Sequence, residues 1–274
     1  MNQGIWKVLR HDEQSELFWY WLPGWSFQPE VFKSLSKQLP GTHLGLDHLA
    51  LFKAIRTDGS SAPTFADAVT AILKQTRHSG HWIGWSLGGA LAQACCSQLQ
   101  QQPQGAIDLT PLILTTMATG NSFLQYNVGE HGMAADVFFA FCRSLDKMPA
   151  KTLKRFVALC CQGVENQREL ATHILKFQFS GEDEHLNMLS NSLQWLTQYQ
   201  LNKHFPLTDG FDSTAIYAAN DAMSAGGLQA RQLLTLGHSH ALPQEQQALD
   251  ALQQLLANKL QPAGTVETAG PLND

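Results

Sequence analysis

Charged side chains are scarce in this chain. Asp, Glu, Lys and Arg make up 15% of its 274 residues, against roughly 25% in an average soluble domain. Apolar residues reach 44%, yet no apolar run approaches the roughly 18 residues that a membrane-spanning helix requires. The net charge of −5 gives no general attraction for nucleic acid, and no basic cluster is large enough to give a local one. We therefore expect a soluble globular protein with neither a membrane nor a nucleic-acid partner.

The cysteines and histidines lack the spacings of metal and redox sites. The five cysteines include two adjacent pairs, Cys95-Cys96 and Cys160-Cys161, and no C-x-x-C motif, so we interpret them as small buried apolar residues. None of the eleven histidines belongs to an H-E-x-x-H motif. The sequence therefore predicts no metal and no organic cofactor. The N-terminal residues also lack a basic stretch followed by an apolar one, so we expect no signal peptide and a cytoplasmic, monomeric protein.

Short apolar runs alternate with amphipathic segments over most of the chain. Residues 17–22, an aromatic run that stops at Pro-Gly, predict a buried strand, and residues 64–78 predict a helix that opens with a T-x-x-D capping box. The same reasoning predicts strands at 43–46, 81–84, 108–115, 214–218 and 232–236, and helices at 29–39, 90–99 and 243–260. This alternation without hairpin signals is typical of the α/β class, with a parallel sheet between two layers of helices.

Residues 120–200 interrupt the alternation, because only helical patterns occur there. The predicted helices are 134–145, 149–163, 168–177 and 186–199. We therefore predict a core formed by residues 1–119 and 201–260 and a helical lid formed by residues 120–200. Residues 261–274 are rich in Pro, Gly and Thr and predict a mobile tail.

Residues 84–88 carry the motif G-x-S-x-G between a predicted strand and a predicted helix. This is the context of a nucleophile elbow, a sharp turn that has no room for side chains beside the nucleophile. The turn projects the serine hydroxyl away from the sheet and directs the N-terminus of the helix towards it. We therefore predict Ser86 as a catalytic nucleophile.

A nucleophile elbow requires an acid and then a histidine later in the chain. Asp221 follows the strand predicted at 214–218, and His240 follows the strand predicted at 232–236. We assign His240 as the general base and Asp221 as the group that orients its imidazole. His238 remains an alternative base, because a residue two positions earlier on an extended segment faces the same side. Asp209 and Asp212 are alternative acids, but they precede their strand.

The oxyanion of an acyl-transfer reaction needs backbone N–H donors. One is the N–H of the residue after the nucleophile, here Leu87. The second is expected from the turn that follows the first buried strand, where Trp25 is the candidate; Pro23 has no N–H. The alternative is that this turn only connects a strand to a helix.

These motifs resemble the α/β-hydrolase superfamily, and more closely the pimeloyl-acyl-carrier-protein methyl ester carboxylesterases of biotin synthesis (the BioH type). The segments that carry the resemblance are L-P-G-W-S at 22–26, G-W-S-L-G-G at 84–89, A-D-V-F at 135–138, K-R-F-V-A-L at 154–159, L-S-N-S-L at 189–193, Y-A-A-N-D at 217–221 and H-S-H-A at 238–241. The resemblance implies an α/β-hydrolase fold and a serine carboxylesterase without a cofactor. It also favours His240 over His238.

The resemblance further implies which residues contact the substrate and its carrier. The positions that would line the acyl chain hold Trp25, Trp85, Phe141 and Phe156; plain core packing is the alternative for the two phenylalanines. The positions that would bind the acyl-carrier protein hold Lys151, Arg155 and Arg168. Between residues 143 and 176 there are seven Lys and Arg against three acids, which would attract an acidic partner. The alternative is that these are ordinary solvated charges.

Three features depart from the family pattern. Pro23 stands where the superfamily usually has His, residues 47–51 replace an early Gly-rich loop, and Asp221 and His240 are separated by only 19 residues. The short separation predicts a trimmed helix between the last two strands. Two other functions therefore remain open: a general short-chain carboxylesterase, and a carrier-protein-binding module without turnover.

Overall fold

The computed structural model describes residues 2–56, 62–102, 109–125, 132–221, 223 and 226–260. The tail predicted at 261–274 lies outside the described residues. Within the described ranges, no helix is both long enough and apolar enough to cross a membrane.

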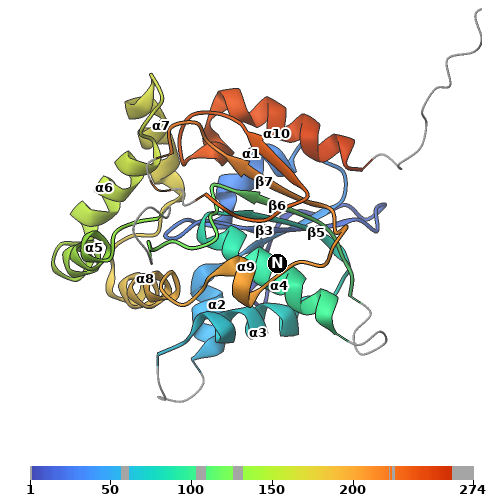
Figure 1. Ribbon diagram of the computed structural model, residues 1–274, viewed down its shortest axis with the longest axis horizontal. Coiled ribbons are helices and arrows are strands. Elements are labelled where there is room, and N and C mark those ends of the chain that lie inside the picture. Colours follow the sequence, from blue (N-terminus) through green and yellow to red (C-terminus); the bar gives the residue numbers. More distant parts are fainter. Residues whose placement is uncertain are drawn as a thin grey trace, which may run out of the picture.

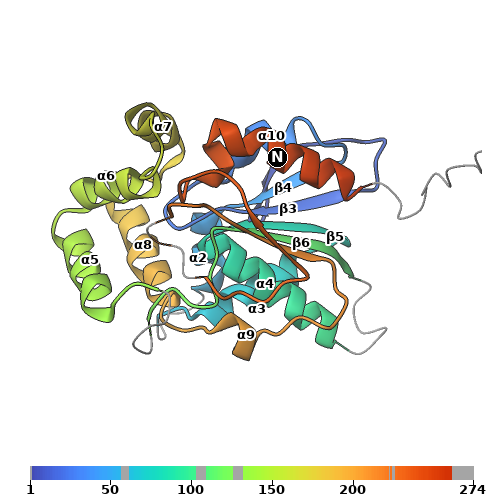
Figure 2. The same ribbon diagram turned by 45° about the horizontal axis from the view of Figure 1, so that its top comes forward.

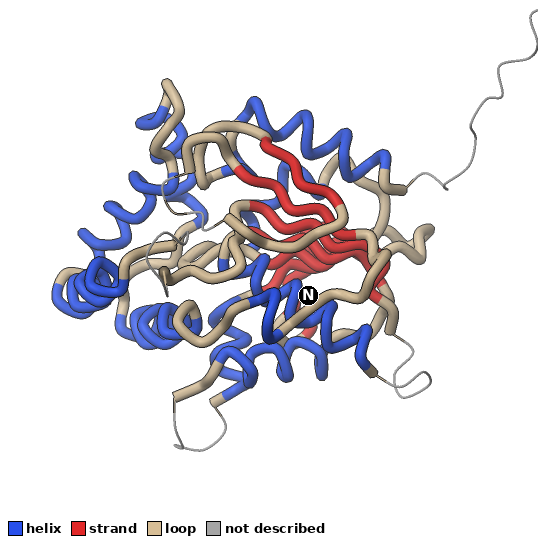
Figure 3. The backbone as a smooth tube through the Cα atoms, in the orientation of Figure 1, coloured by secondary structure: helices blue, strands red, loops and turns tan. Residues whose placement is uncertain are grey.

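A mostly parallel sheet forms the centre of the molecule (Figures 1 and 3). The strands are β1 (Asn2–Gln3), β2 (Trp6–Arg10), β3 (Phe18–Leu22), β4 (Thr42–Leu46), β5 (Gly80–Trp85), β6 (Pro111–Met117), β7 (Ser213–Tyr217) and β8 (Gln232–Thr235). In the described part of the chain their order across the sheet is β1-β2-β4-β3-β5-β6-β7-β8. The β1–β2 and β2–β4 pairs are antiparallel, and all other pairs are parallel. The predicted α/β architecture is confirmed.

Two N-terminal strands were not predicted from the sequence. Strand β2 carries Lys7 and Arg10 and has one buried residue, Trp6, so its apolar pattern is weak. It exists because it pairs with β4, about 40 residues further along the chain. A local pattern cannot reveal a strand whose formation depends on such a distant partner.

Aromatic rings fill the centre of the sheet. All seven tryptophans of the chain are buried. Tyr20 of β3 lies directly opposite Trp82 of β5, with ring centroids 4.8 Å apart, and Trp6 of β2 lies 4.9 Å from Tyr20. Such cross-strand aromatic pairs stabilise a sheet beyond the burial of their area, so the aromatic run at 17–22 holds the middle of the fold together.

Helices cover both faces of the sheet (Figure 1). Helices α1 (Lys33–Ser36) and α10 (Gln246–Asn258) lie on one face, and α2 (His48–Ile55), α3 (Phe65–Gln75) and α4 (Leu87–Gln101) lie on the other. Short 3-10 turns, η1 (Pro29–Phe32) and η3 (Leu242–Gln244), precede α1 and α10.

The predicted capping box of α3 is present: the Thr64 side chain accepts from Asp67 N, and the Asp67 carboxylate accepts from Thr64 N.

Helix α2 occupies the segment where the family pattern has a Gly-rich loop. Asp47 caps this helix, since its carboxylate accepts from Leu49 N at 2.9 Å and from Ala50 N at 3.0 Å. Capping satisfies N–H groups that have no partner within the helix. The replacement of the loop at 47–51 is therefore the beginning of a helix that packs beside α3.

The helical insertion lies between β6 and β7 in sequence. It contains α5 (Ala135–Lys147), α6 (Pro149–Cys160), α7 (Gln167–Ile174), η2 (Leu175–Phe177) and α8 (Asp183–Trp195), followed by the short α9 (Leu201–His204). Figure 2 shows α5 to α8 as a group beyond one end of the sheet. The four predicted helices correspond to α5, α6, α7 and α8 with shifted ends. We call α5 to α8 the lid.

The connection between β7 and β8 differs from the prediction in its secondary structure. The described residues between Tyr217 and Gln232 form no helix, so the helix expected there in trimmed form is absent from the described part of this connection. A turn at residues 219 and 220 follows β7, and its N–H groups donate to Gly237 O and His238 O, which brings Asp221 close to the loop that follows β8.

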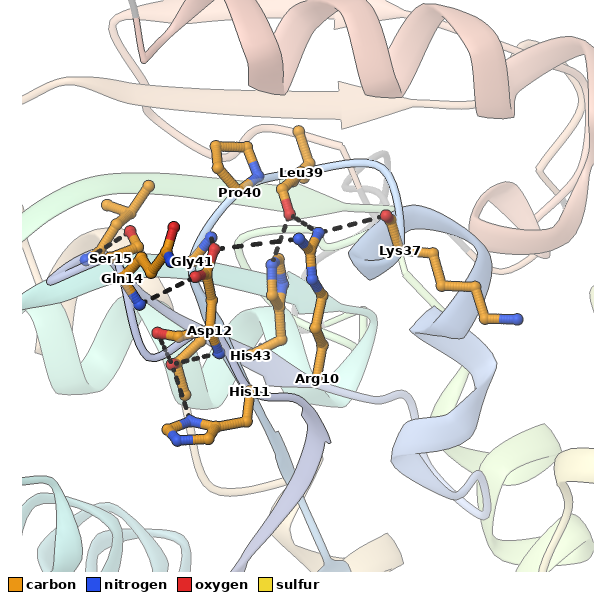
Figure 4. A network of polar contacts seen from close by, with 12 residues as sticks. Arg10, His11, Asp12, Gln14, Ser15, Lys37, Leu39, Pro40, Gly41 and His43 are labelled. Atoms are coloured by element: carbon orange, nitrogen blue, oxygen red, sulfur yellow. Dashed lines mark hydrogen bonds and ion pairs between the residues drawn. The ribbon is translucent and has the colours of Figure 1, made fainter.

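A polar network joins the end of β2 to the segment that enters β4 (Figure 4). The Arg10 guanidinium donates to the carbonyl groups of Lys37 and Leu39, and Asp12 accepts from Gly41 N at 3.2 Å. Buried His43 of β4 reaches the same Leu39 carbonyl through Nε2 at 3.1 Å. Trp21 of β3 donates through its indole N–H to Nδ1 of His43 at 3.0 Å. This network links the end of β2 to the start of β4 and to Trp21 of β3.

Candidate active site

Ser86 forms the predicted elbow between β5 and α4. Its backbone has φ 54° and ψ −120°, a region that side-chain-bearing residues rarely adopt and that costs free energy. The surrounding contacts maintain it: Ser86 N donates to Met117 O of β6 at 2.8 Å, and Ser86 O accepts from Gly89 N at 2.9 Å. The strained turn places Ser86 directly before the N-terminus of α4.

The two glycines of the G-x-S-x-G motif allow α4 to begin against the sheet. A Cβ atom on Gly84 would lie 2.4 Å from Gly88 O, and a Cβ atom on Gly88 would lie 2.0 Å from Leu22 O at the end of β3. Both distances are far below van der Waals contact and involve backbone atoms. The motif is therefore a steric requirement of this turn.

The turn that follows β3 lies beside Ser86. A Cβ atom built on Gly24 would lie 3.4 Å from Cβ of Ser86, so the next residue, Trp25, is on the same side of the sheet as the elbow. Leu87 is the first residue of α4, and the first N–H groups of a helix have no intrahelical partner. Because the chain leaves β3 towards α1 and leaves β5 towards α4 on the other face, a crevice opens between these strands, as in other α/β sheets.

A buried histidine supports this turn, and sequence reasoning missed it. Nε2 of His48, in the first turn of α2, lies 3.0 Å from Pro23 O; because a carbonyl only accepts, Nε2 carries the proton and donates. Burial lowers the pKa of His48 below its usual value. The superfamily pattern has a histidine at position 23, whereas this chain brings an imidazole to the turn from α2. Only the tertiary contact could reveal it.

His240 and Asp221 form a buried pair. Nδ1 of His240 lies 2.8 Å from Oδ2 of Asp221, and their side chains are 3% and 1% exposed. The other carboxylate oxygen accepts from Met223 N at 2.8 Å. A carboxylate beside Nδ1 keeps the proton on that nitrogen and leaves Nε2 as the basic atom. The alternative base, His238, is exposed to solvent.

The alternative acids lie elsewhere. Asp212 forms an ion pair with Lys259 at 2.5 Å, and Asp209 lines a separate polar cleft with Arg231 and Asn202. Both precede β7, as expected from their position in the sequence. The structure therefore brings Asp221, and neither of these two residues, to His240.

Ser86 and His240 line the same cavity under the lid. The remaining lining residues are Trp25, Phe123, Met133, Phe138, Phe141, Phe156, Leu159, Leu193, Leu196 and Met223. All of them are apolar, and Trp25 contacts Phe156 and Phe141 edge-on at centroid distances of 4.9 and 5.7 Å. The space left for water is about 20 Å³, close to what a single water molecule needs. The lid thus closes an apolar pocket over the elbow.

Three of the four residues predicted to contact the acyl chain line this cavity, and Trp85 does not. The Trp85 indole N–H donates to His240 O at 2.7 Å, and its ring packs 4.8 Å from that of Phe27. Trp85 is the last residue of β5, and the turn at Ser86 directs the side chains of Trp85 and Ser86 away from each other. The prediction placed Trp85 in the pocket, whereas the structure places it behind the loop that carries His240.

Several pocket residues were not predicted. Phe138 and Leu193 lie in lid segments that carry the family resemblance, but the sequence alone does not separate residues that face the elbow from residues that pack within the lid. Phe123, Met133 and Met223 lie in loops, where no periodicity marks the inward-facing positions. Apolar character did not mark Phe138, because its neighbours Val137 and Phe139 are equally apolar and are exposed.

The basic residues of the lid face solvent. Lys151 and Arg155 of α6 and Arg168 of α7 are exposed, and none takes part in an ion pair between described residues. Arg168 and Lys176 line a cleft of about 700 Å³ between α7 and the start of α10. Across the described lid, residues 143–176 keep an excess of four positive charges.

No group of three or more His, Cys, Asp or Glu side chains within the described ranges could hold a metal ion. All five cysteines are free, and four of them are buried. Burial raises the pKa of the Cys95 and Cys160 thiols well above their usual value. These thiols are therefore neutral and offer no second nucleophile.

A family model described as "Thioesterase domain" matches residues 20–204. The matched region is more than half of the chain and includes most of β3, the elbow and the lid. The chain belongs to the thioesterase-domain family. This family lies within the α/β-hydrolase superfamily, in agreement with the fold, whereas the narrower resemblance to BioH-type esterases is not established by the match.

Solved structures share the fold of this family member at low sequence identity. The enol-lactonase from Burkholderia xenovorans LB400 has a TM-score of 0.68 at 12% identity and covers 93% of this chain and 95% of its own. BioG from Haemophilus influenzae has a TM-score of 0.54 at 15% identity, with coverages of 86% and 93%. The RedJ thioesterase of the prodiginine pathway of Streptomyces coelicolor has a TM-score of 0.53 at 15% identity, with coverages of 90% and 91%. Identities this low demonstrate a common fold alone.

Proposed function

We propose that this protein is a serine hydrolase that cleaves an acyl ester through a covalent acyl-enzyme. The single observation that supports this most strongly is the meeting of the strained Ser86 elbow and the His240–Asp221 pair at one apolar cavity. The Ser86 hydroxyl attacks the ester carbonyl while Nε2 of His240 takes its proton. The N–H groups of Leu87 and Trp25 stabilise the oxyanion. His240 then protonates the leaving alcohol, and water, deprotonated by the same nitrogen, releases the acid.

The proposed substrate is the methyl ester of a pimeloyl chain carried by an acyl-carrier protein. The cavity beside Ser86 is lined by apolar side chains, which match an alkyl chain in polarity and offer no charged partner for a polar substrate. Because the cavity holds only about 20 Å³, the lid side chains that line it must move apart to admit the chain. Lys151, Arg155 and Arg168, which form no ion pair with another described residue, would attract an acidic carrier. The resemblance to BioH-type esterases supplies the identity of the acyl group, and with it a role in biotin biosynthesis.

A second candidate reaction is hydrolysis of the thioester that joins the acyl group to its carrier. The match to the thioesterase-domain family favours it. The same residues would perform both reactions, because a thioester and an oxygen ester pass through similar tetrahedral intermediates. The two candidates differ in which carbonyl of the carrier-bound chain lies beside Ser86.

One substrate distinguishes these reactions. Methyl pimeloyl-carrier protein contains both bonds, so methyl esterase activity releases methanol and leaves the acyl chain on the carrier, whereas thioesterase activity releases the free carrier thiol. Mass spectrometry of the carrier separates the two products. We expect methanol release that is lost in Ser86→Ala; thiol release would replace the esterase proposal with the thioesterase, and hydrolysis that persists in Ser86→Ala would exclude the serine mechanism.

The carrier contact is tested by reversing the charges of the lid. Lys151→Glu with Arg155→Glu should slow turnover of the carrier-bound ester at least about tenfold at low salt, because steering by charge is lost. Hydrolysis of p-nitrophenyl butyrate should be unchanged. Lys74→Glu with Lys203→Glu is the matched control, since both lysines are exposed and lie outside the lid. Equal losses on both substrates would assign the lid cations a structural role.

Two further alternatives have direct tests. A general short-chain esterase would hydrolyse p-nitrophenyl butyrate and neglect the carrier-bound ester. A carrier-binding module without turnover would leave a fluorophosphonate probe unreacted, whereas the proposed enzyme should be labelled at Ser86.

A further inference from the structure

The loop that carries His240 is held by a buried carboxylate from the next element. Oε1 of Glu245 accepts from His238 N at 2.7 Å, and Oε2 accepts from Ser239 N at 2.9 Å and from Ser239 Oγ at 3.0 Å. Glu245 itself is buried. Each of its two carboxylate oxygens therefore accepts a hydrogen bond from one of the two backbone N–H groups immediately before His240.

The carboxylate is itself fixed in place. Glu245 is the N-cap residue of α10, and Ala248 N donates to its carbonyl at 2.9 Å. Gly237 leaves the space that the carboxylate occupies: it has φ +67°, and a Cβ atom there would lie 2.9 Å from Oε1 of Glu245. The start of α10 and the loop after β8 are thus locked together through one side chain.

Burial of a carboxylate costs free energy, because the charged form loses its hydration. An apolar side chain at the same place would carry no such cost. None of the ion pairs between described residues involves Glu245; its carboxylate oxygens contact the N–H groups of His238 and Ser239 and the Ser239 hydroxyl, and it lines the cleft that also holds Arg168 and Lys176. Hydrogen bonds to an ionised acceptor are shorter and stronger than neutral ones. Two such bonds from consecutive N–H groups to one carboxylate define the orientation of the backbone segment. An apolar side chain would fill the same space without defining the loop.

The consequence for His240 is positional. Its carbonyl accepts from the Trp85 indole and its Nδ1 faces Asp221, so its ring and its following peptide have partners of their own. Glu245 fixes the backbone of His238 and Ser239, and this backbone sets the distance between the His240 ring and Ser86. Small displacements of a reacting group by about 1 Å can reduce a rate about 100-fold.

We propose that Glu245 is a positioning residue of the hydrolase: through the backbone of residues 238 and 239 it holds His240 where Nε2 can accept the Ser86 proton. The proposal rests on the serine mechanism proposed above. Glu245 does not touch the substrate, and its role is exerted entirely through His240.

The test is Glu245→Gln, which keeps the size of the side chain. An amide has one accepting oxygen, so its NH₂ group would face one of the two backbone N–H groups. We expect kcat to fall at least about tenfold with KM within about twofold, because the pocket that binds the acyl chain is unchanged. Labelling of Ser86 by a fluorophosphonate should slow in parallel. The matched control is Asp250→Asn, the same chemical change at an exposed position of α10, which should leave both rates unchanged.

A second variant guards against misfolding. Glu245→Asp keeps the charge but is too short to reach both N–H groups, and it should also lower kcat without raising KM. A folded Gln or Asp variant with the kcat and labelling rate of the wild type would overturn the proposal, as would a loss that appears only in KM. Failure of the serine mechanism has a different signature, since Ser86→Ala would then retain hydrolysis whatever the behaviour of the Glu245 variants.

Discussion

Acidification should destabilise this protein through a buried histidine far from the proposed active site. The indole N–H of Trp21 can only donate, so Nδ1 of His43 must be unprotonated to accept it, and Nε2 carries the proton that is donated to Leu39 O. Both ring nitrogens are therefore committed in the neutral form. Burial lowers the pKa of His43 from 6.5 to about 4, and burial likewise lowers the pKa of His81 to about 4.

The sign and size of the effect follow from proton linkage. Between pH 6.5 and 4 the unfolded chain binds a proton at each of these histidines and the folded chain does not, so the free energy of unfolding falls as the pH decreases. A pKa lowered from 6.5 to about 4 corresponds to a loss of roughly 2 kcal/mol per histidine between pH 7 and pH 5. His43 and His81 together should remove about 4 kcal/mol.

The assay is urea unfolding at pH 5, 6 and 7, followed by tryptophan fluorescence, in the wild type and in His43→Phe. The variant loses one titrating group but keeps an aromatic ring between Trp19 and Trp21, so its stability should depend less steeply on pH by about 1 kcal/mol per pH unit. Leu44→Ala, a buried truncation in the same strand, should lower stability equally at every pH. An unaltered pH dependence in His43→Phe would refute the reasoning.

Three other predictions, made with four substitutions, test the fold and the site. Gly88→Ala should destabilise the protein by about 3 kcal/mol and lower esterase activity, because the new Cβ would meet Leu22 O; urea unfolding and hydrolysis of p-nitrophenyl butyrate measure the two effects, and a variant as stable as the wild type would contradict the packing. His240→Ala should reduce kcat by several orders of magnitude and His238→Ala by less than about threefold, since His240 is paired with Asp221 and His238 is exposed; the reverse order in a kinetic assay would exchange their roles. Asp47→Ala should cost about 1 kcal/mol of unfolding free energy, measured in urea, through the lost cap of α2, and no change would show that the cap is dispensable.

The parts of the fold that sequence reasoning predicted are those decided by local chemistry. The apolar run at 17–22 can only be buried, so it became the central strand β3. The Thr64–Asp67 capping box operates within one turn and marked the start of α3. The motif at 84–88 encodes its own geometry, because Gly84 and Gly88 are the residues that an elbow around Ser86 can accommodate.

Periodicity was insufficient wherever two candidates share the same local pattern. His238 and His240 stand on one side of an extended segment, and only the position of Asp221 after β7 separates them. Trp25 and Trp85 both lie beside the elbow, and the indole N–H of each donates to a backbone carbonyl, yet Trp25 lines the pocket and Trp85 does not. Such differences depend on where a side chain points after the chain turns.

By itself the sequence determined the class of fold, the lid and the elbow, because strand burial, helix capping and steric exclusion act over a few neighbouring residues. The tertiary structure alone decided the pairing of β2 with β4, the contact of His48 with the Pro23 turn, and the hydrogen bonds between Glu245 and the loop that carries His240. Each of these contacts joins separate elements of the chain. Their geometry follows from the packing of whole elements against the sheet, which no local pattern contains.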